Sequence, residues 1–111
     1  MKKSTLALAF AGIMITGTAF AEPIVGNWTT GSGGKTKIAA CGSSFCVSVT
    51  SGEFAGRQIG KFDKDGDRYR GRITDPQNDR TYRGTAWFEG AALKMRGSVL
   101  GIGRTDTWTR R

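Results

Sequence analysis

Few side chains in this chain could carry out chemistry, and their types point away from catalysis. The 111 residues include no His, so the side chain that most often serves as a general base near neutral pH, and as a metal ligand, is missing. Most of the nine Asp and Glu residues sit at predicted turns, where Asp side chains accept hydrogen bonds from nearby backbone amides. An acid without a base partner forms no catalytic constellation. We therefore expect no enzyme activity and no cofactor.

One acidic loop and one mid-strand acid could in principle bind a cation or a polar ligand group. The segment Asp63-Lys64-Asp65-Gly66-Asp67 has some likeness to a calcium loop, but Gly stands at its fourth place instead of the sixth and the distal Glu is missing. A hairpin turn at Asp65-Gly66 explains the segment better, so we expect no metal site. Asp106 is the one acid predicted to lie mid-strand, on the same face as Arg104 and Trp108. Asp106 and Arg104 form either a structural ion pair or a group that orients a polar ligand head.

Cys41 and Cys46 are the two cysteines of the chain. An even number of Cys in an exported protein favours a disulfide over a redox or metal pair, which would call for a His or further Cys. Alternation in the flanking segments places both sulfurs on a polar face beside the turn at residues 42–45. We expect a disulfide that contributes about 2 kcal/mol through loop-closure entropy.

Residues 1–21 have the pattern of a secretory signal peptide. Lys2 and Lys3 form the charged start, residues 6–15 the apolar run, and Ala19-Phe20-Ala21 the cleavage site. The apolar run is too short to span a bilayer, which takes about 20 residues. We expect cleavage after Ala21, a single mature domain of residues 22–111 without a transmembrane segment, and a periplasmic or secreted location. The mature chain keeps 15 of the 17 Lys and Arg residues, so the basic excess belongs to the domain.

Beyond residue 22, turn signals cut the chain into short segments, as in all-β sandwiches and barrels, and no segment has a helical stripe. Successive hairpins imply an antiparallel meander. A meander that closes into a barrel has no unpaired edge strands. The predicted fold class is therefore all-β: a small antiparallel up-and-down β-barrel of about eight strands. These strands are expected at residues 25–30, 35–41, 45–50, 58–63, 67–74, 80–89, 92–99 and 104–110.

The interior of an eight-stranded barrel is either filled by side chains or holds one small ligand, and both alternatives stay open. A buried Tyr matters here because its phenol needs a hydrogen-bond partner, which a ligand or trapped water would supply. The candidate ligand-binding residues are Tyr69, Tyr82, Phe88, Met95, Asp106 and Trp108. Alternation along the strands predicts that the inward side chains are Val47, Val49, Tyr69, Ile73, Tyr82, Ala86, Phe88, Leu93, Met95 and Val99.

A short motif recurs every 13 residues, as Tyr69-Arg70-Gly71, Tyr82-Arg83-Gly84 and Met95-Arg96-Gly97. In each copy the Arg is predicted to point outward and the Gly to lie on the apolar face. Gly weakens a strand, so three at matched positions indicate either tight bending or a place where something approaches the backbone. Curvature of a small barrel and a ligand cavity are the two explanations.

The opposite face of the same strands is predicted to be basic. Like charges directly across a ladder repel, so these side chains are either offset and solvated or neutralised by an anionic partner. That partner would be an acidic envelope component, such as lipopolysaccharide phosphates or an anionic wall polymer. Nucleic acid is not expected, because no row of outward aromatics interleaves with the basic residues. The basic surface residues are Arg68, Arg70, Arg72, Arg83, Lys94 and Arg96.

The two ends of the mature chain carry a recognisable pair of motifs. Gly26-Asn27-Trp28 resembles the G-x-W signature of lipocalins and related calycin barrels. In those folds an Arg or Lys of the last strand packs across this Trp at the closed end of the barrel. Arg110 in Trp108-Thr109-Arg110 is the matching residue, and such a stacked pair is worth on the order of 1 kcal/mol.

The whole mature chain resembles a family of small secreted bacterial proteins of unknown function. The resemblance covers residues 23–28, 38–41, 56–60, 74–76, 82–84 and 108–110. Members often carry a further Cys pair near the last strands, where this chain has residues 98–103 without Cys, so that staple is missing here. The family brings no established activity.

These observations lead to one expected function and one alternative. The first is an exported, non-catalytic barrel that binds a small apolar or amphipathic molecule. The alternative is an interaction module that uses the basic outer face on an acidic envelope component.

Overall fold

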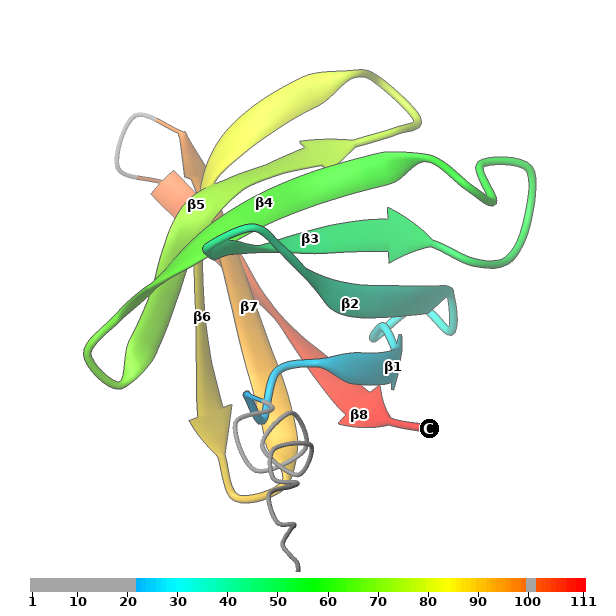
Figure 1. Ribbon diagram of the computed structural model, residues 1–111. Helices are drawn as coiled ribbons and strands as arrows, with labels where there is room; N and C mark the ends of the chain where they lie inside the picture. The colour runs from blue at the N-terminus through cyan, green and yellow to red at the C-terminus, as the bar shows by residue number, and fades with distance from the viewer. Residues whose placement is uncertain (1–21, 100–101) are drawn as a thin grey trace, which may run out of the picture.

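The computed structural model describes residues 22–99 and 102–111. Eight antiparallel strands follow one another in chain order and close into one barrel through pairing of the first with the last (Figure 1). The predicted all-β up-and-down barrel is confirmed, and the described residues include no helix. The predicted signal peptide lies outside the described residues. The strands are β1 (Gly26–Thr29), β2 (Lys35–Cys41), β3 (Ser44–Val49), β4 (Gln58–Asp65), β5 (Arg68–Asp75), β6 (Arg80–Glu89), β7 (Ala92–Val99) and β8 (Ile102–Arg110).

Hairpin chemistry sets the register of the meander. Three of the turns have two-residue loops that begin with Gly42, Gly66 and Gly90, whose φ angles are 68°, 65° and 62°. Positive φ at the first loop residue belongs to the turns whose twist matches that of paired strands. One irregularity occurs between β3 and β4, where Val47 pairs with Gly60 but Ser48 pairs with Gln58.

The core fills one part of the barrel. Most residues predicted to point inward are buried or pack against the core, whereas the side chain of Val99 lies outside the described residues. Phe62, which the inward pattern missed, is fully buried, as is Ile24 before β1. The buried core consists of Ile24, Trp28, Ile38, Val47, Ile59, Phe62, Tyr69, Ala86, Leu93, Met95 and Trp108.

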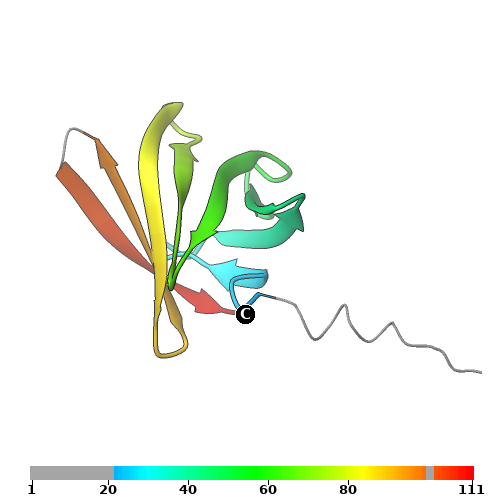
Figure 2. The same ribbon diagram turned by 60° about the vertical axis from the view of Figure 1, so that its left-hand side comes forward.

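The barrel has two different ends. The turn between β6 and β7 lies at the same end as the segment before β1, whereas the β5–β6 turn, the end of β7 and the start of β8 lie towards the other (Figure 2). Ile24 and Trp28 belong to the first end and are 0% exposed, so we call it the closed end. The opposite end is called the open end.

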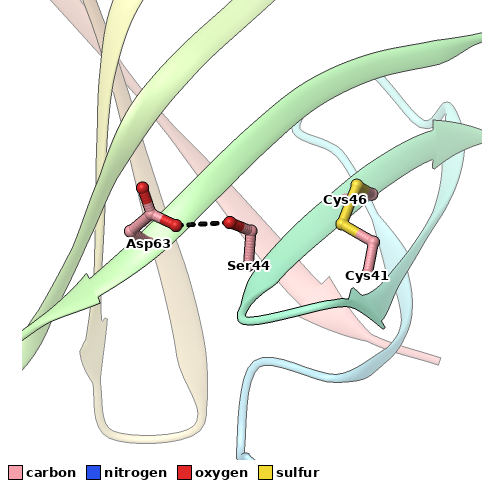
Figure 3. Close-up of a disulfide and its surroundings, with 4 residues drawn as sticks. All are labelled: Cys41, Ser44, Cys46 and Asp63. Atoms are coloured by element: carbon pink, nitrogen blue, oxygen red, sulfur yellow. Dashed lines mark hydrogen bonds between the residues drawn. A yellow bond between two sulfur atoms is a disulfide. The ribbon is translucent and has the colours of Figure 1, made fainter.

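Cys41 and Cys46 form a disulfide across the β2–β3 hairpin (Figure 3). The two Cα atoms lie 5.9 Å apart, and Cys46 pairs in register with Ala39 on β2. Next to the disulfide, the Ser44 hydroxyl donates a hydrogen bond to Asp63 on β4. The disulfide expected from the cysteine count is therefore present, and the hydrogen bond ties its hairpin to the next strand.

Candidate functional site

A cavity of about 520 Å³ lies at the open end between β5, β6, β7 and β8. Its walls combine the aromatic rings of Tyr82 and Trp108 with aliphatic side chains, and charged groups stand among them. Ile102 is 78% exposed and is the one large hydrophobic residue with high exposure among the described residues. The lining residues are Ile73, Asp75, Tyr82, Met95, Gly97, Ile102, Gly103, Arg104, Asp106 and Trp108.

The three repeated glycines explain why the barrel is hollow at one place and filled at another. Gly71, Gly84 and Gly97 are direct neighbours across β5, β6 and β7. A methyl group on Gly71 would overlap the Lys61 carbonyl, and one on Gly84 would lie 2.8 Å from the Phe62 ring. At Gly97 the nearest atom would be Cβ of Tyr82, at an ordinary 3.5 Å.

The two explanations of the glycine motif, strand curvature and a ligand cavity, thus apply to different copies of the motif. Gly71 permits the close approach of two strands, and Gly84 leaves room for a buried Phe ring. Both are requirements of a small, strongly curved barrel. Gly97 instead borders the cavity, where the missing side chain leaves space.

Asp106 acts as a structural clamp at this cavity. Its Oδ2 accepts hydrogen bonds from Trp108 Nε1 at 3.0 Å and from the backbone N–H of Gly31 at 3.1 Å. Gly31 lies in the loop between β1 and β2, so the carboxylate joins that loop to β8. The ion pair expected between Arg104 and Asp106 is not formed, which corrects the sequence-based interpretation. The carboxylate is held by neutral donors instead, and Arg104 is left at the rim.

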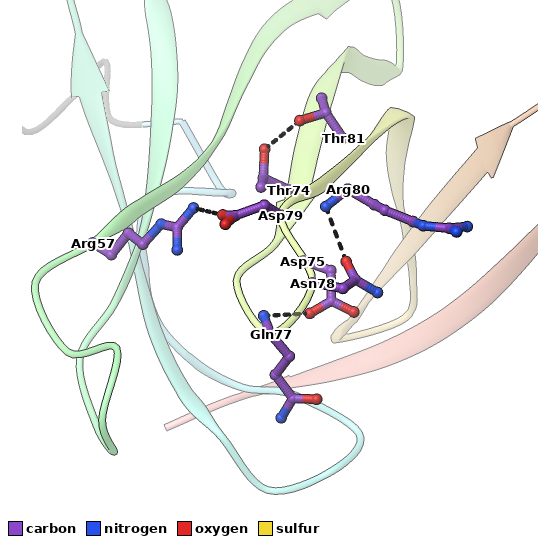
Figure 4. Close-up of polar contacts among 8 residues, drawn as sticks. All are labelled: Arg57, Thr74, Asp75, Gln77, Asn78, Asp79, Arg80 and Thr81. Carbon is purple, nitrogen blue, oxygen red and sulfur yellow. Dashed lines mark hydrogen bonds and ion pairs between the residues drawn. The ribbon is translucent and has the colours of Figure 1, made fainter.

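Asp75 lines the cavity at the end of β5, where the β5–β6 turn begins. Figure 4 shows the polar contacts of this turn. The Asp75 carboxylate accepts the backbone N–H of Gln77 at 2.9 Å, and the Asn78 side chain accepts that of Arg80 at 2.9 Å. Arg57, which precedes β4, forms an ion pair with Asp79 of this turn. The turn is thus held locally and from the neighbouring loop, in the way expected of Asp and Asn side chains at turns.

Two of the six candidate ligand-binding residues lie away from the cavity. Phe88 packs against Trp28 with ring centroids 6.0 Å apart, and Tyr69 meets Phe45 edge to face at 5.7 Å. The Tyr69 hydroxyl donates to Glu22 Oε1 at 2.9 Å, so its partner belongs to the chain. The structure therefore gathers Tyr82, Met95, Asp106 and Trp108 at one cavity and separates Tyr69 and Phe88 from it.

Glu22 also accepts a hydrogen bond from Lys64 Nζ at 2.9 Å. The bonds from Lys64 and Tyr69 hold the pKa of the Glu22 carboxyl below its usual value. Burial, followed by the bond to Glu22, raises the pKa of the Tyr69 phenol. No sequence motif linked Glu22 to these side chains, which are more than 40 residues away in the chain.

Arg110 lies across the ring of Trp28 at the closed end, with 4.3 Å between its guanidinium carbon and the ring centroid. The guanidinium also donates to the carbonyls of Pro23 and Val25. Trp28 Nε1 donates to the Ile24 carbonyl at 2.9 Å. The segment before β1 is thereby drawn across this end, so the cavity opens at the opposite end.

A family described as "Uncharacterized protein conserved in bacteria (DUF2147)" matches residues 53–110 of this chain. The chain belongs to this family. No curated protein and no solved structure matches it at a significant level.

The DUF2147 match covers strands β4 to β8 and includes every residue that lines the cavity. The disulfide, Gly26 and Trp28 lie before the matched segment. Among the described residues of this DUF2147 protein, no helix is long and apolar enough to cross a membrane. Residues 22–99 and 102–111 also contain no group of three or more His, Cys, Asp or Glu side chains placed to hold a metal ion.

Proposed function

We propose that this DUF2147 protein is an exported binding protein that holds one small amphipathic molecule in the open-end cavity. The observation that carries the proposal is the cavity itself, whose 520 Å³ lies within the range of small-molecule sites. An eight-stranded barrel is just wide enough for one such ligand.

The cavity walls favour a ligand with an apolar body and a negatively charged or polar end. Ile73, Met95 and Trp108 offer an apolar surface for the body. Arg104 stands at the rim without an acidic partner among the described residues, and its guanidinium can bind a carboxylate, sulfonate or phosphate. Asp106 holds Gly31 and Trp108, so its role here is to keep the wall in place.

In this proposal the protein binds its ligand without catalysing a reaction on it. The two carboxylates at the cavity, Asp75 and Asp106, accept hydrogen bonds from the chain's own N–H groups, and no His accompanies them. Asp106 accepts through both oxygens, from Gly31, Trp108 and Thr107. Asp75 accepts through Oδ1 and has no His beside it to relay a proton. We therefore infer that the cavity binds a ligand and does not catalyse its conversion.

Export follows from the predicted signal peptide and agrees with the disulfide, which is typical of oxidising compartments. We place the protein in the periplasm or outside the cell. The ligand would then be a molecule met in or beyond the envelope.

Dye binding tests the proposal with a matched pair of variants. The probe is 1-anilinonaphthalene-8-sulfonate, which joins an apolar ring system to an anionic group. Gly97→Leu places a Leu side chain in the cavity, whereas Thr105→Leu places the same side chain on the exposed outer side of β8. We expect Gly97→Leu to weaken binding about tenfold or more, because occupying a ligand's volume costs on the order of 1–3 kcal/mol.

The second measurement identifies what the native protein carries. Protein isolated from its own envelope is examined by native mass spectrometry, and the wild type is expected to carry a small molecule that Gly97→Leu lacks. The proposal fails if folded wild-type protein has no bound molecule and also does not bind the dye. It also fails if both Leu variants bind the dye as the wild type does.

A further inference from the structure

The outer surface of β5 and β6 carries a pair of arginines that face each other. Arg72 and Arg83 are direct partners in the antiparallel ladder, and Lys61 on β4 is the next partner of Arg72. All three side chains are exposed. Like charges directly opposite each other destabilise a sheet, so this row costs stability in the isolated protein.

The other outward pairs on the same two strands are satisfied. Thr74 and Thr81 share a hydrogen bond at 2.8 Å (Figure 4). The guanidinium carbon of Arg68 lies 4.8 Å from the ring centroid of Trp87, an outward aromatic. This single Trp is not the row of aromatics that nucleic-acid binding would need.

The remaining predicted basic residues also have partners. Arg70 Nε donates to Asp65 at 2.7 Å, and Lys94 Nζ donates to the Thr107 hydroxyl at 2.8 Å. Arg96 reaches the hydroxyl of Thr105 at 3.5 Å. Within residues 22–99 and 102–111, no hydrogen bond or ion pair engages the guanidinium of Arg72 or Arg83. The unsatisfied part of the basic surface is therefore confined to one row.

A hollow of about 390 Å³ adjoins this row. Arg72 and Arg83 stand on one side, the Arg70 and Thr85 pair stands on the other, and the backbone between them belongs to two glycines. A ligand there would meet the guanidinium groups of Arg72 and Arg83 and the Thr85 hydroxyl. The third guanidinium, that of Arg70, is paired with Asp65. The lining residues are Arg70, Gly71, Arg72, Arg83, Gly84 and Thr85.

We propose that this hollow is a binding site for a phosphate group. A tetrahedral phosphate accepts several hydrogen bonds at once, and the planar fork of Arg matches two of its oxygens. Its negative charge would offset the repulsion between Arg72 and Arg83, and the Thr85 hydroxyl adds a further donor. The site lies on the outer face and is separate from the proposed luminal ligand. The phosphate is either free or part of a lipid headgroup.

The test compares two double variants that remove the same charge. Arg72→Gln/Arg83→Gln changes the proposed site, and Lys37→Gln/Arg111→Gln removes two exposed cations outside the hollow. Binding of inorganic phosphate is measured by calorimetry at fixed ionic strength. Binding of vesicles is measured by sedimentation, with either phosphatidylglycerol or neutral phosphatidylcholine. We expect the first variant to weaken phosphate-group binding about tenfold or more and the second to have little effect.

The calorimetric and vesicle measurements distinguish a free phosphate from the phosphate of a lipid headgroup. Calorimetric binding of inorganic phosphate that only the first variant loses indicates a free phosphate. Binding restricted to phosphatidylglycerol vesicles, and lost in the same variant, indicates a lipid headgroup. Arg72→Lys/Arg83→Lys keeps the charge but not the fork, so it is expected to bind more weakly than the wild type.

Folding is followed independently by the urea midpoint. Removing facing cations should leave the midpoint of Arg72→Gln/Arg83→Gln at or above that of the control variant. The proposal is overturned if neither phosphate source binds, or if the two double variants weaken binding equally. Dye binding in the lumen should not change in either variant, which keeps this result distinct from that of the luminal site.

Discussion

Glu22 joins the segment before β1 to the barrel through one carboxylate oxygen. That oxygen accepts hydrogen bonds from Lys64 on β4 and from Tyr69 on β5. These donors lower the pKa of Glu22 in the folded state from its usual 4.5. A group with a lowered folded-state pKa stabilises the fold above its unfolded-state pKa and loses that contribution as the pH falls through the folded-state value.

We therefore predict a pH-dependent effect of Glu22→Gln. The variant should unfold at a lower urea concentration than the wild type at pH 7, because a neutral amide replaces the ionised carboxylate that accepts hydrogen bonds from Lys64 and Tyr69. The difference should shrink as the pH falls below 4.5 and through the lowered folded-state pKa, because protonation then removes the ionised carboxylate from the wild type too. Urea midpoints from pH 7 to pH 3 measure this change. Glu53→Gln, which removes an equal charge from an exposed loop, is the reference. A difference that stays constant with pH would contradict the prediction.

At the scale of the strands, the neighbouring glycines Gly71, Gly84 and Gly97 have three different surroundings. Gly71 lies close against the backbone of Lys61 and Phe62 on β4, Gly84 lies beneath the Phe62 ring, and Gly97 borders the cavity. Their spacing in the sequence is identical, so the repeat alone does not distinguish them. The difference comes from Phe62, which fills the lumen beside the first two.

The same substitution should accordingly have opposite effects at two of these positions. Gly84→Ala places a methyl group 2.8 Å from a buried ring, and such overpacking destabilises by about 1–3 kcal/mol. Gly97→Ala makes ordinary contacts, and Ala is favoured over Gly inside a strand by roughly 0.5–1 kcal/mol. Free energies of unfolding from urea titrations measure both. Equal destabilisation by the two variants would show that curvature, and not the position of Phe62, governs these positions.

At the scale of the whole molecule, barrel closure depends on a short seam. β1 and β8 pair through two registered positions, Trp28 with Arg110 and Thr29 with Thr109. Beyond the strands, the N–H of Arg111 donates to the Asn27 carbonyl at 3.1 Å. The bond from Gly31 to Asp106 extends the closure towards the open end. The seam is therefore the place where the barrel should open first.

Asp106→Ala is predicted to loosen this seam. It removes the acceptor of both Gly31 and the buried Trp108 indole, and an unsatisfied buried donor costs about 1–3 kcal/mol. Hydrogen exchange should quicken at the amides of β1 and β8 and change little in the β5–β6 pair. Arg104→Ala removes a neighbouring charge that makes no ion pair within the described residues, and serves as the control. Uniformly faster exchange across all strands would contradict a local role for Asp106.

Much of the barrel could be predicted from local chemistry. Strands β2, β6 and β7 have the predicted bounds, because alternation of apolar and polar residues and Gly at turns act over a few neighbouring residues. The disulfide also followed from the cysteine count and the turn between the two cysteines. The stacking of Arg110 on Trp28 was implied by the resemblance to the lipocalin motif. Four of the six candidate ligand residues were found in the same way.

Other features arise from contacts between distant parts of the chain. The register shift between β3 and β4 buries both Ile59 and Gly60. Strict alternation from Ile59 would have placed Phe62 outside, whereas Phe62 is fully buried. Tyr69 has a partner more than 40 residues away, and Asp106 is held by a loop 75 residues away instead of by Arg104. A periodic pattern assigns each side chain to a face of its strand. Which residues then meet across the lumen depends on register, curvature and closure, and these are properties of the assembled barrel.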